Sequence, residues 1–196
     1  MLKLEAPGSA DRILLHSCCA PCSGAIIECL LANGITPTIF FSNSNITPLE
    51  EYELRKAEIR RYAEGLGLEV VDDDYDHKAW LESVRGLERE PERGARCTQC
   101  FRGRLERAAR YAAGHGFTVL ATTLASSRWK DLEQVGAAGQ WACCIVNAGV
   151  PEDKKVIWWD QNWRKGGLQP RRSEIIREQN FYNQLWCGCE FSRREV

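Results

Sequence analysis

The sequence has little methionine and histidine and no long apolar run. Its 196 residues include one Met and three His, and no stretch stays apolar over the roughly 20 residues that a membrane-spanning helix needs. The first ten residues have neither the apolar core nor the cleavage pattern of a signal peptide. We therefore expect a cytoplasmic protein without a membrane partner. The net charge of -1 also gives no overall reason to expect a nucleic-acid partner.

Cysteine, in contrast, is abundant, with ten residues in the chain. The cytosol keeps thiols reduced, and a chain of this length can bury a sufficient core without disulfides. The cysteines are grouped in the sequence as Cys18, Cys19 and Cys22; Cys97 and Cys100; Cys143 and Cys144; Cys187 and Cys189; with Cys29 by itself. Groups at ligand spacing are typical of metal-binding or redox sites. We therefore expect the sulfur atoms to carry chemistry.

Composition and length predict one folded domain over residues 1–196. With 44% hydrophobic and 27% charged residues, the chain has the composition of a globular protein rather than a disordered or fibrous one. Acidic residues dominate residues 50–82, whereas basic residues outnumber acidic ones in 85–110 and 164–196. The basic stretches either contact the phosphates of a nucleic acid or form solvated helix faces, and charge alone does not separate these interpretations.

Short apolar segments alternate with amphipathic ones along the chain. The pattern predicts strands at 12–16, 36–41, 68–71, 117–122 and 155–160, and helices at 20–33, 48–64, 77–84, 98–113, 130–147 and 170–179. Thr47 is the expected N-cap of the second helix. Such alternation predicts an α/β fold, doubly wound, with a mainly parallel sheet and helices on both faces. Sites in these sheets form at the carboxyl ends of the strands, so the loops 16–22, 42–47 and 122–127 should converge.

Two of the cysteine groups lie where a helix begins. Cys18, Cys19 and Cys22 follow the first strand, close to a helix N-terminus, whose dipole favours the thiolate form that binds metals. Cys97 and Cys100 stand at the start of a later helix. If Cys18 and Cys19 join Cys97 and Cys100, four thiolates suit either an iron-sulfur cluster or tetrahedral zinc. The adjacent pair favours the cluster, because neighbouring thiolates can reach different irons. Cys22 is either a third ligand of the loop or a packing residue.

The pair Cys187-Gly-Cys189 near the end of the chain needs a separate interpretation. It can form a short, strained and easily reduced disulfide, it can donate metal ligands, or its thiols can be structural. Gly188 gives the backbone the freedom that so short a bridge needs. We favour a redox-active pair and treat Cys187 and Cys189 as candidate catalytic residues.

The remaining candidates are less specific. Cys29, Cys143 and Cys144 lie in predicted helices beside apolar residues and are expected to be small buried hydrophobic side chains. His16 is the one histidine close to a cysteine group. It is either a catalytic proton donor or a residue that is hydrogen-bonded at the end of a strand.

An ordered set of motifs over nearly the whole chain resembles the cobalamin-independent epoxyqueuosine reductases (QueH). The motifs are His16-Ser-Cys-Cys-Ala-Pro-Cys22, Phe41 to Pro48 with Glu51-Tyr-Glu-Leu-Arg55, Arg96-Cys-Thr-Gln-Cys100 with Arg104-Leu105, Thr122-Thr-Leu with Ser127 and Lys130, Trp163-Arg-Lys-Gly-Gly167, and Phe181-Tyr-Asn-Gln-Leu-Trp-Cys-Gly-Cys189 with Ser192. Each motif alone is weak, whereas the ordered set is specific. The chain differs from the usual family pattern in Trp186, where Tyr is common, and in Arg128, where Pro is common.

The resemblance implies a cofactor, a substrate and a reaction. It implies a [4Fe-4S] cluster on Cys18, Cys19, Cys97 and Cys100, a redox-active pair formed by Cys187 and Cys189, and an additional iron ion without assigned ligands. The implied substrate is tRNA that carries epoxyqueuosine at the wobble position, reduced to queuosine with electrons from an external donor. The implied fold is of the PP-loop or HUP type.

Three other functions compete with this one. A PP-loop enzyme that transfers sulfur to tRNA needs a Gly- and Ser-rich pyrophosphate loop after the first strand, where this chain has Cys18 and Cys19. A zinc-stabilised RNA-binding module would use the thiolates only as structural ligands. A thioredoxin-like reductase built on Cys19-Ala-Pro-Cys22 leaves the later cysteine groups unexplained.

Overall fold

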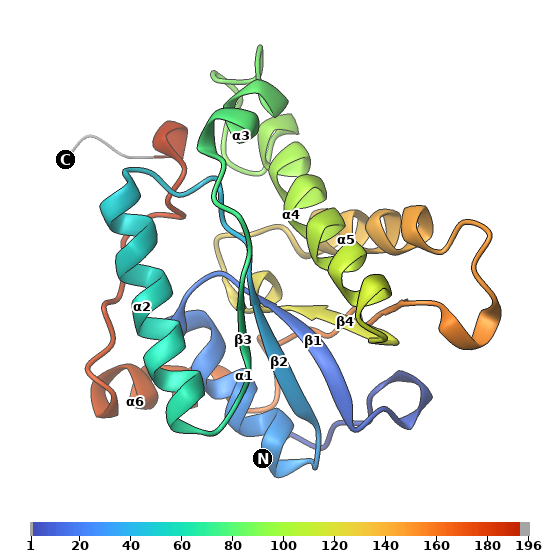
Figure 1. Ribbon diagram of the computed structural model, residues 1–196. Coiled ribbons are helices and arrows are strands. Elements are labelled where there is room, and N and C mark those ends of the chain that lie inside the picture. Colours follow the sequence, from blue (N-terminus) through green and yellow to red (C-terminus); the bar gives the residue numbers. More distant parts are fainter. Residues whose placement is uncertain (1, 193–196) are drawn as a thin grey trace.

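The computed structural model describes residues 2–192, which form a five-stranded sheet with helices on both faces (Figure 1). The strands are β1 (Arg12–Ser17), β2 (Thr36–Phe41), β3 (Val70–Asp72), β4 (Val119–Thr122) and β5 (Ile157–Trp158). All neighbouring strands are parallel, in the order β3-β2-β1-β4-β5. The predicted α/β class and parallel sheet are confirmed.

Six α-helices connect and cover the strands within the described part of the chain. They are α1 (Ala20–Ala32), α2 (Leu49–Gly65), α3 (His77–Ser83), α4 (Ala95–Gly114), α5 (Leu132–Val146) and α6 (Leu168–Glu178). Figure 1 shows α1, α2 and α6 on one face of the sheet and α4 with α5 on the other. All six predicted helices are therefore present, with ends that differ by a few residues.

Alternate residues of the strands fill two separate cores. In β1, Ile13 and Leu15 pack with residues of α1, α2 and α6, whereas Leu14 packs with residues of α4 and α5. The two adjacent tryptophans Trp158 and Trp159 likewise belong to opposite cores. This alternation follows from the period of two in a strand, and it places a helical layer over each face.

Three strands, β3, β4 and β5, are shorter than predicted. Beside β3 and β5, backbone N–H groups bond outside the sheet. The N–H of Leu68 donates to the carbonyl oxygen of Ala63 at 3.0 Å, which closes the end of α2, so β3 begins only at Val70. The N–H of Val156 faces away from β4, because the next N–H, of Ile157, donates to Thr118, and it donates to Oδ1 of Asn147 at 2.9 Å. Both local bonds are made by residues that the apolar pattern assigns to strands.

The predicted N-cap of α2 is wrong. The N-cap is Pro48, which makes no side-chain hydrogen bond, and the helix begins at Leu49. The N–H of Thr47 instead donates to the carbonyl oxygen of Gly188 at 3.0 Å. Thr47 therefore contacts the far end of the chain instead of capping the helix.

The strand order places a topological switch point between β1 and β4. The chain leaves β1 into α1 on one face, whereas α4 enters β4 from the other face, and ligands of open α/β sheets bind at the carboxyl ends of such strands. The predicted loops do converge there: Nδ1 of His16 lies 2.7 Å from Oγ1 of Thr122. Nδ2 of Asn43 donates to the carbonyl oxygen of Ser17 at 2.9 Å. The site is therefore expected at this edge.

Among residues 2–192, no helix is long and apolar enough to cross a membrane. The predicted single domain over 1–196 includes residues 1 and 193–196, which lie outside the described residues, as does the end of the basic stretch 164–196.

Candidate metal and thiol site

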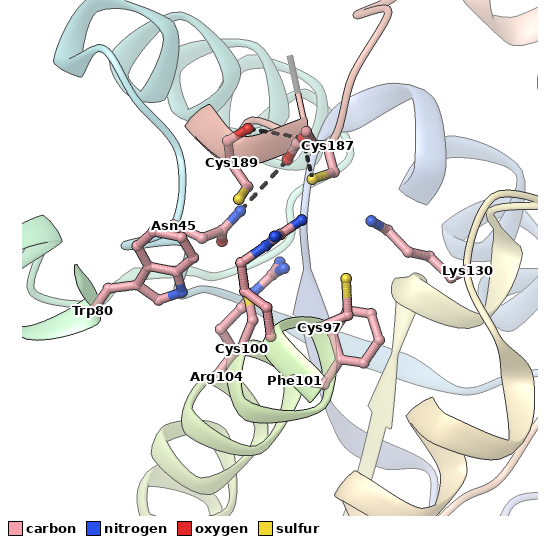
Figure 2. A pocket seen from close by; sticks show the side chains of 11 residues that line it. Asn45, Trp80, Cys97, Cys100, Phe101, Arg104, Lys130, Cys187 and Cys189 are labelled. Atoms are coloured by element: carbon pink, nitrogen blue, oxygen red, sulfur yellow. Dashed lines mark hydrogen bonds between the residues drawn. The ribbon is translucent and has the colours of Figure 1, made fainter. Parts of the chain in front are cut away.

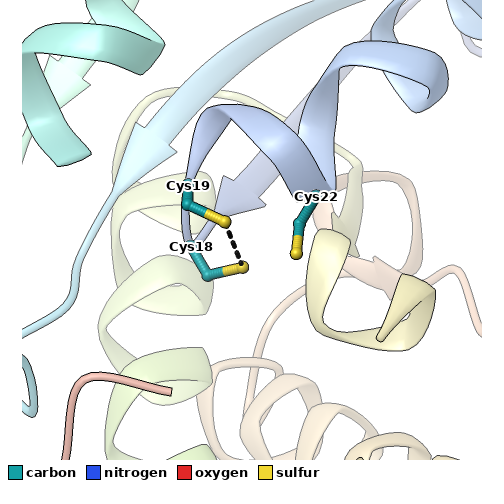
Figure 3. Close-up of side chains that lie close together, drawn as sticks. All are labelled: Cys18, Cys19 and Cys22. Atoms are coloured by element: carbon teal, nitrogen blue, oxygen red, sulfur yellow. Dashed lines mark hydrogen bonds between the residues drawn. The ribbon is translucent and has the colours of Figure 1, made fainter. Parts of the chain in front are cut away.

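Three cysteine sulfurs meet where β1 ends and α1 begins. Ligand atoms of Cys18, Cys19 and Cys22 all lie within 4.8 Å of one another, and the sulfurs of Cys18 and Cys19 are 3.7 Å apart (Figure 3). Pro21 lies in the first turn of α1 and presets the backbone for the helix, which turns Cys22 back toward the loop. Cys22 is therefore part of the sulfur group and not only a packing residue.

The polar surroundings of this triad favour one thiolate. Hydrogen bonds from Cys19 and Cys22 lower the pKa of the Cys18 thiol well below its ordinary value. Burial raises the pKa of Cys19, and the hydrogen bond to Cys18 raises the pKa of Cys22 to about 12. Nε2 of Gln184 lies 2.6 Å from the sulfur of Cys19 and donates to it. The triad is thus arranged to hold negative charge on sulfur, the form that binds metals.

A pocket beside α4 collects the other four predicted site cysteines. Cys97 and Cys100 lie in the first two turns of α4, and they line this pocket together with Cys187 and Cys189 from the end of the chain (Figure 2). The sequence predicts these residues as two separate pairs, and the tertiary structure brings the pairs together. Figure 2 shows the sulfur of Cys97 and the ammonium group of Lys130 pointing toward Cys187.

The two thiols of the Cys187–Cys189 pair differ in acidity. A hydrogen bond from Cys189 and the charge of Lys130 lower the pKa of Cys187 well below its ordinary value. The same hydrogen bond raises the pKa of the Cys189 thiol. The hydroxyl of Ser192 lies 3.0 Å from the sulfur of Cys187. Cys187 is therefore the more acidic thiol of the pair.

Lys130 is a cation that the sequence analysis names in a motif but to which it assigns no role. Burial by itself lowers the pKa of Lys130, but the thiols of Cys187, Cys97 and Cys100 raise it, and the net shift is upward. Its ammonium nitrogen also lies 5.7 Å from the ring centroid of Phe101. Lys130 thus keeps a positive charge among sulfur atoms.

The last described segment, residues 179–192, reaches the pocket by following α2 backward. Arg61 donates to the carbonyl oxygen of Gln179 at 3.1 Å, and the N–H of Tyr182 donates to Glu58 at 2.6 Å. Further along, Arg55 donates to the carbonyl oxygens of Trp186 and Cys187. These contacts carry the Cys187–Cys189 pair to the carboxyl edge of the sheet.

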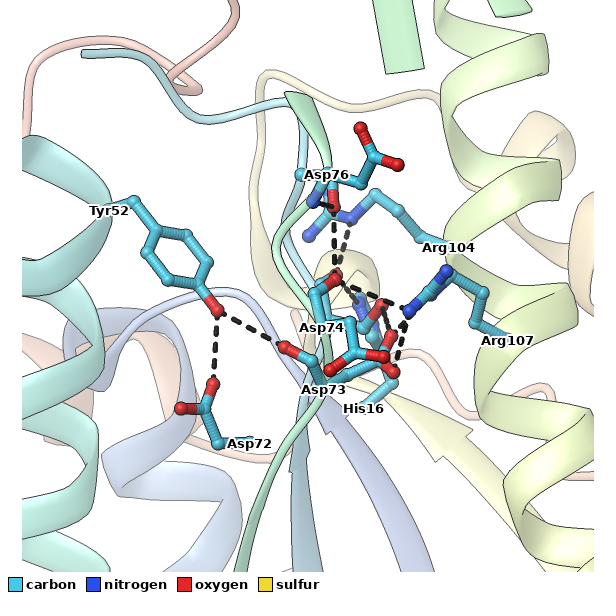
Figure 4. A network of polar contacts seen from close by, with 10 residues as sticks. His16, Tyr52, Asp72, Asp73, Asp74, Asp76, Arg104 and Arg107 are labelled. Carbon is cyan, nitrogen blue, oxygen red and sulfur yellow. Dashed lines mark hydrogen bonds and ion pairs between the residues drawn. The ribbon is translucent and has the colours of Figure 1, made fainter. Parts of the chain in front are cut away.

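Arg104 links the triad and the pocket. It is 6% exposed, lines the pocket, and donates to the carbonyl oxygen of Ser42 at 3.3 Å and to Oδ1 of Asn43. Its charge also acts on Cys18 in the triad. Figure 4 shows Arg104 beside a polar network that includes Asp73, which accepts from Ser42 at 2.6 Å and from Arg107. One buried guanidinium therefore lies between the two thiol groups.

His16 belongs to this network rather than to the lining of the pocket. It is fully buried, Nε2 lies 3.2 Å from the carbonyl oxygen of Ser42, and Nδ1 lies 2.7 Å from the hydroxyl of Thr122. A carbonyl oxygen only accepts, so Nε2 carries the hydrogen and Nδ1 accepts from Thr122. Burial lowers the pKa of His16 to about 3. The imidazole is neutral, and its predicted role as a catalytic proton donor stays a prediction.

Three buried polar atoms of residues that line the pocket have no hydrogen-bond partner within residues 2–192. They are Oδ1 of Asn45, Nε1 of Trp80 and Nε of Arg96. Buried polar atoms of this kind are expected to bind water or a ligand. The sequence placed Asn45 in the converging loop 42–47 and Arg96 in a motif without assigning either a role, and it missed Trp80, which lies in no motif.

The other cysteines lie outside this site. Cys29 and Cys143 are 1% exposed, as predicted, and burial raises the pKa of Cys143 to about 12. The prediction that Cys144 is buried is wrong, because Cys144 is exposed. Adjacent residues of a helix point about 100° apart, so only one of the two faces the core.

The donor set fits a metal or a thiolate-bound cluster. Soft thiol donors concentrate at two helix N-termini, and the buried Arg104 and the half-buried Lys130 offset the negative charge of several thiolates. In the described part of the chain, the three-ligand group within 4.8 Å is the triad, and Cys97 and Cys100 lie outside it. Thiolates that hold different irons of one cluster stand farther apart than ligands of one ion. Both a cluster and a single ion therefore remain compatible with these donors.

Fold and site together define a parallel α/β protein with thiol chemistry at a switch point of the sheet. The sequence profile of the family described as "Epoxyqueuosine reductase QueH" matches residues 13–195. The chain belongs to this family.

Three bacterial relatives carry the same name, "Epoxyqueuosine reductase QueH". The Haemophilus influenzae protein is 48% identical over 98% of this chain and 76% of its own length. The Acinetobacter baylyi protein is 47% identical over 100% of this chain and 86% of its own. The Thermotoga maritima protein is 30% identical over 93% of this chain and 91% of its own. The similarity thus extends through every element that builds the site.

Proposed function

We propose that the protein reduces the epoxide of epoxyqueuosine, at the wobble position of tRNA, to the alkene of queuosine. The epoxide takes up two electrons and two protons, both of its C–O bonds break, and the oxygen leaves as water. The observation that carries this proposal is the convergence of redox-capable thiols from three parts of the chain at one edge of the sheet. Membership of the epoxyqueuosine reductase family supports it.

We assign a [4Fe-4S] cluster to Cys18, Cys19, Cys97 and Cys100. The first two follow β1 and the last two lie at the start of α4, where helix dipoles favour the thiolate form and oppose the burial that raises the pKa of Cys19 and Cys97. When bound, such a cluster supplies electrons one at a time. The additional iron ion expected from the resemblance has no ligands assigned, and Cys22, the third sulfur of the triad, is the candidate that the geometry offers.

The chain's own residues then bind the substrate and hold protons. Cys187 and Cys189 provide a two-electron thiol pair, in which Cys187 is the more acidic thiol and Cys189 the one that retains its proton more readily. Asn45 and Trp80 offer one acceptor and one donor to the hydroxylated ring of the substrate. Basic residues around the pocket attract the phosphates of the anticodon stem-loop, and an external donor replaces the electrons consumed.

The decisive experiment combines metal analysis with an activity assay on protein purified without oxygen. We expect about four iron and four labile sulfide per chain, a brown colour bleached by dithionite, and conversion of epoxyqueuosine in tRNA. Replacement of Cys187 by Ser should preserve the colour and lower turnover by about a hundredfold or more. Cys29→Ser, at a buried position outside the site, is the matched control.

Two outcomes would contradict the proposal. A colourless protein with stoichiometric zinc would favour a zinc-stabilised RNA-binding module, for which the closely spaced triad is the specific observation. A brown protein that binds tRNA but leaves epoxyqueuosine unchanged would retain the cluster and exclude the reaction.

A further inference from the structure

Trp129 is the most exposed aromatic side chain beside the thiol pocket. It is 67% exposed, whereas the next residue, Lys130, lines the pocket. Consecutive Cα atoms are about 3.8 Å apart, so the two side chains lie on the outer and inner sides of one wall. Single exposed apolar residues are common on protein surfaces, so exposure by itself indicates nothing.

The backbone that carries Trp129 is held by two arginines from different parts of the chain. Arg93 donates to the carbonyl oxygens of Arg128 and Trp129, at 3.2 and 3.1 Å. Arg164 donates to the carbonyl oxygens of Ser127, and of Lys130 at 2.6 Å. Four consecutive carbonyl groups are thus bound by two guanidinium groups. A loop fixed in this way presents its side chains in one arrangement, which lowers the entropy lost on binding.

The same two guanidinium groups make this wall positively charged. Burial lowers the pKa of Arg164, and the nearby charge of Arg93 lowers it further. The carboxylate of Asp131 acts on Arg164 in the opposite direction and accepts from the N–H of Gln134 at 3.0 Å. Arg93, Arg164 and the exposed Arg128 outnumber this carboxylate, so the net charge of these four residues favours an anionic partner.

We propose that Trp129 stacks on an unpaired base of the tRNA anticodon loop that neighbours the modified nucleotide. This inference rests on the proposed function, which requires the modified nucleotide to enter the pocket lined by Lys130. Its neighbours in the RNA chain must then lie at the rim, where Trp129 offers an aromatic face and Arg93 and Arg164 offer charge. Aromatic stacking on unpaired bases is the usual way in which proteins hold single-stranded RNA.

An acidic protein that donates electrons is a different partner for the same surface. Electron transfer does not need contact at the rim, whereas the base next to the reacting nucleotide cannot avoid it. The rim position therefore favours RNA over a donor protein.

The test is a double-mutant cycle between the protein and the RNA. It uses the anaerobically purified holoprotein and an anticodon stem-loop with epoxyqueuosine, in which either neighbouring nucleotide is made abasic. We expect Trp129→Ala to raise Kd by about tenfold to a hundredfold, and Trp129→Phe to raise it less. The abasic change at the nucleotide that stacks on Trp129 should raise the Kd of the wild-type protein by a similar factor. Trp129→Ala and this abasic change together should raise Kd no more than either change alone.

Leu66→Ala changes an exposed apolar residue next to α2, at the opposite end of the sheet, and is the matched control. The inference is overturned if Trp129→Ala binds RNA with the Kd of the wild type. It is also overturned if Trp129→Ala raises Kd by the same factor on both abasic RNAs as on the unchanged RNA. It is also overturned if the variant slows turnover with a protein donor and not with dithionite, which would assign Trp129 to donor docking. A wild type that does not bind or reduce this RNA would overturn the proposed function as well.

Discussion

The guanidinium group of Arg55 joins a buried carboxylate to the backbone of Cys187. Its Nε donates to Glu51 at 2.7 Å, and one Nη donates to the carbonyl oxygen of Cys187 at 3.2 Å. Arg55 is 2% exposed, and its guanidinium lies 5.1 Å from the ring centroid of Trp186. The hydroxyl of Tyr182 also donates to Glu51, at 3.2 Å. Arg55 is therefore a positioning residue for the Cys187–Cys189 pair, which it touches only through the backbone.

Replacement of Arg55 should separate positioning from folding. Arg55→Lys keeps the charge but loses the forked geometry, so we expect turnover to fall about tenfold or more, with unchanged iron content and KM for tRNA. Arg55→Ala leaves Glu51 buried without its partner and should lower the free energy of unfolding by about 3–5 kcal/mol. Steady-state kinetics and denaturant unfolding measure the two effects.

Arg61→Lys is the matched control for Arg55. Arg61 lies on the same helix and contacts the same segment, at the carbonyl oxygen of Gln179, away from the cysteines. Its replacement should leave turnover unchanged. Equal losses in both variants would show that α2 only anchors the segment and does not position the pair.

Gly188 should tolerate no side chain. Its φ is +99°, and a Cβ would lie 2.8 Å from Cγ1 of Ile46 and 3.2 Å from the guanidinium of Arg55. Gly188→Ala should therefore displace the pair, destabilise the fold by about 1–3 kcal/mol and lower turnover. Gly149→Ala, also at positive φ but with open space around it, should cost only backbone strain. Similar activity in the two variants would contradict the close packing of Gly188.

Cys22 should distinguish a cluster from a single metal ion. If Cys18, Cys19, Cys97 and Cys100 hold the cluster, Cys22→Ser should keep the brown colour and the roughly four irons of the cluster. It should lose only the additional iron ion, if Cys22 binds one. Cys97→Ser should lose the colour. Iron and sulfide analysis with a visible spectrum measures both. Loss of all metal in Cys22→Ser with full retention in Cys97→Ser would place the metal on the triad alone.

His16 should contribute to the pH dependence of stability. Burial holds its pKa at about 3, below the ordinary 6.5. Between these values the unfolded chain binds a proton that the folded chain does not, so stability falls as the pH decreases below about 6.5. The slope is about 1.4 kcal/mol per pH unit, and His16→Gln should lack it.

Denaturant unfolding between pH 5 and 8 measures this slope, with the exposed His115→Gln as the control. Because the neutral imidazole already donates to Ser42, we expect His16→Gln to keep turnover within about tenfold of the wild type. A much larger loss of turnover, without loss of stability, would support the proton donor role instead.

The local periodicity of the sequence was sufficient to predict the architecture. Apolar runs such as 12–16 and 36–41 can only be buried between two layers, so their alternation with amphipathic segments required a parallel sheet covered on both faces. The ends of elements were less predictable, because Thr47 and Leu68 made bonds that the periodicity does not contain.

The cysteine spacing in the sequence likewise indicated which residues carry chemistry, because thiols at ligand spacing have few other uses in a reducing compartment. Only the tertiary structure decided which groups share a site. Cys97, Cys100, Cys187 and Cys189 come together because residues 179–192 follow α2 to the edge of the sheet, held by Arg55 and Arg61. Contacts between residues more than a hundred positions apart leave no periodic signal. The burial of Arg104 and the exposure of Trp129 were decided in the same way, by packing between distant segments.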